Sequence, residues 1–320
     1  MTTTIMFSYE VGNNSSTNTT DFDKTATITE SWICVVLIVT GLLINILVLT
    51  ALATVSDEIF NKSVRLILSN IVGGCILIGT SGLILSIMNL ICGYFNLTPS
   101  IGVCRAFIGL YLIGGAVRYA FMATSAIVIF LLVQLKNAVK IWKISVALTV
   151  VLLLIIVALC LPAISESVTG VLFIQGVSCF PYSKSNSNAD IYLGFLIILF
   201  PVLSYVIVIT VPILTLFYLK QHNISGDIGP QRALIKFNFL LIIGNTLNLL
   251  SQLVPIIEFY GRHPVDVQDD EDKVITMLYY RSILNYISLL PSSLMIILYF
   301  KSIRHQVCSL LKLKGCRGKF

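Results

Sequence analysis

The sequence predicts an all-α polytopic membrane protein, a bundle of seven transmembrane helices. Charged residues make up 11% of the 320 residues and hydrophobic residues 57%, whereas a soluble protein carries about 25% charged residues. A helix needs roughly 20 apolar residues to cross a bilayer, and runs this long without alternation indicate helices and not barrel strands. The seven runs are Trp32–Val55, Val64–Leu90, Ile101–Leu135, Ile144–Ile164, Ile191–Leu219, Leu234–Ile257 and Met277–Phe300.

The chain is expected to form one domain, because no polar stretch between the runs is large enough for a soluble domain. We predict a disordered extracellular tail over residues 1–30, the bundle over 31–300, and a cytoplasmic amphipathic helix with a basic tail over 301–320. No basic segment followed by a short apolar one marks a cleavable signal peptide in Met1–Glu30. The first helix is therefore expected to act as a signal anchor.

The distribution of Lys and Arg predicts an extracellular N-terminus and a cytoplasmic C-terminus in the plasma membrane, since basic residues stay on the cytoplasmic side. With this orientation the inner face and the C-terminal segment hold Lys62, Arg65, Lys136, Lys140, Lys143, Lys220, Arg232, Lys236, Lys301, Arg304, Lys312, Lys314, Arg317 and Lys319. The formal net charge of +6 therefore indicates membrane topology, and we expect no nucleic-acid partner. The expected partner of the apolar helices is the lipid bilayer.

Asn-x-Ser/Thr triplets agree with this orientation, because four of them fall on the predicted outer face. The predicted glycosylation sites are Asn13, Asn14, Asn18 and Asn96.

Cysteines on the outer face are expected to meet an oxidising environment. Cys104, at the outer start of the third helix, and Cys179, in the second outer loop, are predicted to be joined, with Cys92 as the competing partner for either. Cys308 and Cys316 lie on the predicted reducing side and are not expected to form a structural disulfide. The cysteines expected to pack as small apolar groups inside helices are Cys34, Cys75 and Cys160.

Seven helices, an outward N-terminus and this cysteine pair resemble the rhodopsin-like (class A) G-protein-coupled receptors. The resemblance runs from Trp32 to about Cys316 and includes Gly41-x-x-x-Asn45 in the first helix. Proline bends a helix because it removes a hydrogen bond and clashes with the preceding turn. The prolines at suitable places are Pro162, Pro201, Pro255 and Pro291.

Residues Lys301–Leu313 put apolar side chains on one side and basic ones mostly on the other, which predicts an interfacial amphipathic helix. This segment resembles the eighth helix of the family. The resemblance implies palmitoylation of Cys308 or Cys316.

The chain departs from the family at its polar activation motifs. Val128-Ile129-Phe130 stands where the Asp-Arg-Tyr triplet is expected, and Leu290-Pro291-Ser292-Ser293-Leu294 replaces Asn-Pro-x-x-Tyr. Val117-Arg118-Tyr119 comes too early in the third helix to serve as that triplet. These departures weigh against coupling to a G protein far more than against the predicted fold.

Arg118 lies deep in a predicted helix, where a charge costs at least about 2.5–3.5 kcal/mol and usually faces the bundle interior. By resemblance it lies near the family's sodium site, and we hypothesise that its guanidinium replaces the ion. The other reading is an arginine that snorkels or sits in a water-filled cavity. The expected partners in this polar core are Asn45, Asn285, Ser288, Ser292 and carbonyls freed by Pro291.

A ligand pocket would lie between the outer thirds of the third, fifth, sixth and seventh helices. By resemblance, Tyr111 stands where receptors for biogenic amines carry Asp, and Leu284 where opsins carry the retinal-binding Lys. A biogenic amine and retinal are therefore not expected as ligands. No cofactor or metal is implied. The candidate lining residues are Tyr111, Gln252, Glu258, Tyr280 and Arg281.

The leading functional prediction is a receptor that transmits an extracellular ligand signal to a cytosolic G protein through its basic inner rim. A small-solute transporter and a non-signalling partner or decoy receptor are the alternatives. We do not expect an enzyme, because the predicted helices hold no His, Asp or Glu to act as base or metal ligand.

Overall fold

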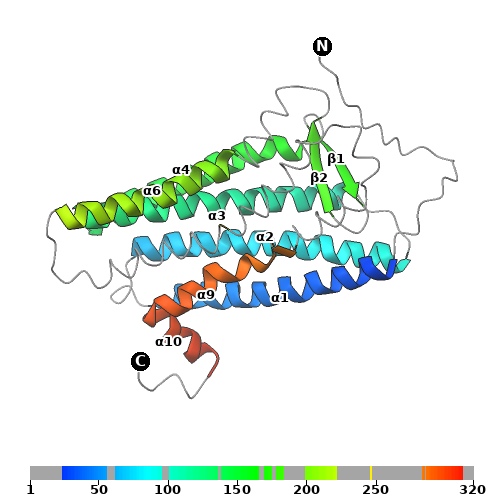
Figure 1. Ribbon diagram of the computed structural model, residues 1–320, viewed down its shortest axis with the longest axis horizontal. Coiled ribbons are helices and arrows are strands. Elements are labelled where there is room, and N and C mark those ends of the chain that lie inside the picture. The colour runs from blue at the N-terminus through cyan, green and yellow to red at the C-terminus, as the bar shows by residue number, and fades with distance from the viewer. Residues whose placement is uncertain are drawn as a thin grey trace, which may run out of the picture.

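The computed structural model describes residues 24–55, 62–95, 101–135, 138–165, 169–174, 178–183, 199–221, 246, 283–284 and 286–312. In this part of the chain the long helices lie side by side (Figure 1). A small β-hairpin lies at one end of the helices and a short helix lies at the other (Figure 1).

Five described helices are long and apolar enough to cross a membrane. They are α1 (Lys24–Thr54), α2 (Lys62–Phe95), α3 (Ile101–Leu135), α4 (Ala138–Ile164) and α6 (Phe200–Gln221). They correspond to the first five predicted runs, and α3 has the predicted bounds. The seventh run is described in part, with helical residues from Ile283 and the apolar helix α9 (Leu289–Tyr299).

The sixth predicted run, Leu234–Ile257, lies outside the described residues except for Thr246. The hydroxyl groups of Thr246 and Tyr205 are hydrogen-bonded, which joins this position to α6.

Three helices begin earlier than their apolar runs. α1 begins at Lys24 instead of Trp32, α2 at Lys62 instead of Val64, and α4 at Ala138 instead of Ile144. Backbone hydrogen bonds continue into the polar flanks, because the helical ladder does not depend on apolar side chains. Residues 24–30 therefore belong to α1, which corrects the predicted tail and places Glu30 inside a helix.

Helices α2 and α3 form the centre of the described bundle. α2 packs against α1 and α3, while α3 also contacts α4 and α6. A close approach makes the central contact tight: a Cβ built on Gly74 would lie 2.8 Å from the carbonyl oxygen of Gly114 and 2.9 Å from the backbone nitrogen of Arg118. Small residues let helix backbones approach in this way inside membranes.

The prolines differ in their positions. Pro162 lies within α4, and Pro255 lies outside the described residues. Pro201 lies in the first turn of α6 as described, where a proline is well tolerated, and the proline in the interior of α6 is Pro212, which the sequence did not lead us to expect. Pro291 lies in the first turn of α9, directly after a turn at Ser288.

The segment between α4 and α6 contains a two-stranded antiparallel sheet, which the all-α prediction omitted. β1 (Thr169–Ile174) pairs with β2 (Ser178–Ser183), and Phe173 is the register partner of Cys179. Two short strands bury too little apolar surface to be stable alone. The hairpin contacts α3, which gives it support.

The predicted amphipathic helix is present as α10 (Lys301–Leu310). Ile303 and Val307 are buried in the main hydrophobic cluster, and α10 packs against α1 and α9. Gln306 donates a hydrogen bond to the Thr54 hydroxyl at the end of α1 (2.9 Å). α10 is therefore docked on the helices through its apolar face.

Cys308, on α10, is disulfide-bonded. This corrects the expectation of a reduced, acylatable thiol at this position, which considered the compartment but not whether another sulfur was close. Cys316 lies outside the described residues.

Candidate functional site

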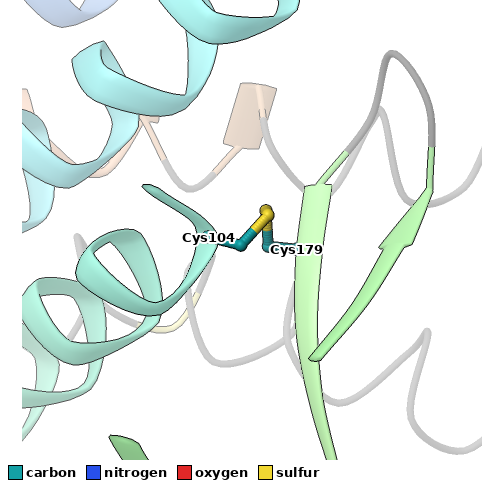
Figure 2. Close-up of a disulfide and its surroundings, with 2 residues drawn as sticks. All are labelled: Cys104 and Cys179. Atoms are coloured by element: carbon teal, nitrogen blue, oxygen red, sulfur yellow. A yellow bond between two sulfur atoms is a disulfide. The ribbon is translucent and has the colours of Figure 1, made fainter. Parts of the chain in front are cut away.

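The predicted pair Cys104 and Cys179 is joined by a disulfide. Their Cα atoms are 5.5 Å apart although 75 positions separate them in sequence. Figure 2 shows the bond linking the first turns of α3 to strand β2. Cys92, the competing partner, is a buried free cysteine. The disulfide thus attaches the hairpin covalently to the N-terminal end of α3.

A cluster of aromatic side chains lies one to two turns further along α3 from Cys104. Tyr111 is partly buried and stacks on Phe107, with ring centroids 5.7 Å apart. Tyr286, from the last predicted span, is buried and close to Tyr111 and Cys34. Its ring lies on Gly82 of α2, since a Cβ there would be 2.8 Å from its Cζ atom. Four separate segments therefore meet around two phenol rings.

Tyr286 was not among the predicted site residues. A single glycine such as Gly82 in an apolar helix is only a weak signal of close contact, and no spacing rule relates it to a tyrosine 204 residues later. Of the predicted lining residues, Tyr111 is described here. The others, Gln252, Glu258, Tyr280 and Arg281, lie outside the described residues.

Arg118 is the central polar residue, with 0% of its side chain exposed. Its Nη1 donates a hydrogen bond to the Ser288 hydroxyl (3.1 Å), and its Nη2 donates one to the Ser288 carbonyl (2.8 Å). Ser288 was among the partner residues expected from the sequence. The arginine therefore faces the bundle interior and does not snorkel to a surface.

Asn45 provides a second polar link to the same segment. Its Nδ2 donates to the Gly41 carbonyl (2.7 Å) in its own helix and to the Leu289 carbonyl (3.2 Å) in α9. The Ser293 hydroxyl donates to Asn45 Oδ1 (2.7 Å). The first turn of α9 is thus held by α1 on one side and by α3 on the other.

Two further groups, Cys75 and Ser292, belong to this polar core. Its members among the described residues are Asn45, Cys75, Arg118, Ser288, Ser292 and Ser293. Cys75 is fully buried and lies close to the Arg118 guanidinium and to Ser292. Ser292 and Ser293 are also buried. Asn285, which was expected here, lies outside the described residues.

The last two turns of α3 are apolar at the positions where the sequence resemblance would place a charged triplet. Val128 and Ile129 are buried, and Phe130 meets the edge of Tyr218 on α6 with centroids 6.3 Å apart. Arg65, in the first turn of α2, donates to the Val55 carbonyl beyond the end of α1 (2.9 Å). Lys143 and Lys220 are exposed.

Several other predicted sites lie outside the described residues. They are Asn13, Asn14, Asn18, Asn96, Lys136, Arg232, Lys236, Lys314, Arg317 and Lys319.

No protein-family model matches this chain, and no curated protein matches it.

Proposed function

We propose that the chain is a cell-surface receptor with seven membrane spans, similar to the rhodopsin-like G-protein-coupled receptors. An extracellular ligand would stabilise one of two helix arrangements, and a cytosolic G protein would read it at the basic inner rim. The observation that carries this proposal is the bond between Cys104 and Cys179, which holds a hairpin over the start of α3. From that point α3 runs without a break to Leu135.

The proposed ligand site lies beneath the hairpin, around Tyr111 and Tyr286. Phenol rings offer apolar faces with a hydrogen-bonding hydroxyl at the edge. Such a surface favours a neutral, partly apolar ligand, and it lacks the carboxylate of Asp at position 111 that would pair with a biogenic amine.

The proposed route to the inner face runs along α3. Arg118 follows Tyr111 after two turns of the helix. A ligand that shifts α3 at Tyr111 would therefore act on the contact between Arg118 and Ser288.

The inner end of α3 favours a second candidate, a non-signalling partner or decoy receptor. Val128, Ile129 and Phe130 supply no charge for a G protein, and Phe130 packs against Tyr218. Such an apolar inner contact suits a bundle that binds ligand without reporting it.

The deciding experiment measures basal nucleotide exchange after co-expression of the chain with each family of Gα subunit. Tags at Met1 and Phe320 would first establish surface delivery and membrane orientation. Leu154→Ala is a control variant that should behave as wild type, because Leu154 is 66% exposed on α4 and distant from the polar core in sequence. A receptor raises exchange with at least one Gα family, for wild type and control alike.

Other outcomes separate the alternatives. Surface delivery without exchange for any Gα family favours the decoy receptor, and solute uptake or ionic current without exchange favours a transporter. Both tags on the same side of the membrane would contradict the receptor and the decoy together.

A further inference from the structure

We propose that the contact between Arg118 and Ser288 is a latch that holds α9 against α3. Opening this latch would let the start of α9 move away from α3 while α9 stays attached to α1 and α10. The latch consists of contacts inside the bundle and does not depend on coupling to a G protein.

The fixed side of the latch is the crossing of α2 and α3. A Cβ on Gly74 would lie 2.9 Å from the Arg118 backbone nitrogen and 3.1 Å from the Arg118 Cβ. A Cβ on Gly114 would likewise lie 2.9 Å from the Gly74 carbonyl oxygen. Because backbone meets backbone here, Arg118 cannot shift sideways without separating the two helices.

The movable side is the turn at Ser288. This residue is the N-cap of α9, yet its hydroxyl makes no capping bond. One usual capping target, the third residue of the helix, is Pro291, which has no N–H. The hydroxyl and the carbonyl of Ser288 instead accept from the guanidinium.

The pivot is Asn45. Its bonds to Leu289 and Ser293 join α9 to α1 and use none of the Arg118 contacts. α10 packs on both α1 and α9, so α9 keeps contacts with these two helices that do not involve Arg118. Loss of the guanidinium bonds would therefore free α9 from α3 and leave it attached to α1.

The test is backbone hydrogen exchange, measured on the full chain in lipid nanodiscs. Arg118→Met removes both bonds and keeps an apolar side chain of comparable length. The expected result is about tenfold faster exchange in residues 286–293, because charge-assisted hydrogen bonds are lost. Exchange in residues 66–72 of α2 should stay unchanged. Arg304→Met, the same chemical change on α10, is the matched control and should leave residues 286–293 unchanged.

Ser288→Ala is a second, milder variant that removes only the hydroxyl acceptor, so exchange in residues 286–293 should rise by a smaller factor. It decides the matter if Arg118→Met does not fold. Unchanged exchange in residues 286–293 of the folded variants would overturn the latch. An equal rise in α2 would also overturn it, because that result indicates general loosening of the core.

Discussion

The ring of Tyr286 lies directly on the backbone of Gly82. A Cβ at position 82 would be 2.8 Å from Cζ and 2.9 Å from the hydroxyl oxygen of Tyr286. Only 4% of Tyr286 is exposed, so the ring has little room to move. This contact joins α2 to the last predicted span at the level of the proposed ligand site.

Gly82→Ala is expected to lower the free energy of unfolding by about 1–3 kcal/mol, because the added methyl group overpacks the contact with Tyr286. Thermal unfolding in detergent measures the loss. Gly73→Ala is the matched control in the same helix, since a Cβ there meets nothing within 4 Å. That variant should be as stable as wild type or slightly more stable, because alanine favours helix. Equal effects of the two variants would contradict this account of Gly82.

Cys104→Ser and Cys179→Ser should each lower stability by about 2–4 kcal/mol, the usual contribution of a disulfide. The double variant should lose no more than either single variant, because all three lack the same bond. Non-reducing thermal unfolding provides the measurement. Cys92→Ala is the control, since Cys92 forms no disulfide. An effect of the double variant equal to the sum of the two single effects would mean that the cysteines act separately.

Sodium should not stabilise this protein. The guanidinium of Arg118 carries a fixed positive charge in the polar core, and it already uses the hydroxyl and carbonyl of Ser288. A second cation nearby would be repelled at low dielectric. We expect the same unfolding temperature when sodium chloride is replaced by choline chloride at equal ionic strength. A clear upward shift in sodium would show that Arg118 does not replace the ion.

Docking of α10 should depend on its buried side chains. Ile303→Ala is expected to lower stability by about 2–4 kcal/mol and to speed hydrogen exchange across residues 301–310, because Ile303 is completely buried. Leu310→Ala is the control on the same helix, since Leu310 is 39% exposed. Its effect should stay within about 0.5 kcal/mol. Similar exchange in both variants would mean that α10 is held by something other than Ile303.

The sequence was enough to predict the five described membrane helices, the disulfide partners and the amphipathic α10. The helices were predicted from the length of the apolar runs, and α10 from apolar and basic residues on opposite faces of a helix. The disulfide was predicted from the oxidising environment expected at the outer face. Helix ends were harder to predict, because helical backbone bonds continue past the apolar run. α1 therefore starts at Lys24 and includes Glu30.

The sequence by itself determined that Arg118 lies deep in an apolar helix, where a lone charge is too costly and needs either polar partners or a path to water. Only the tertiary structure decided that Ser288 accepts both of its described bonds, while Asn45 holds Leu289 and Ser293. The same is true of Tyr286 on Gly82 and of the strands of the hairpin. Such contacts join residues far apart in the chain. Which residues meet depends on how closely the helix backbones can approach one another.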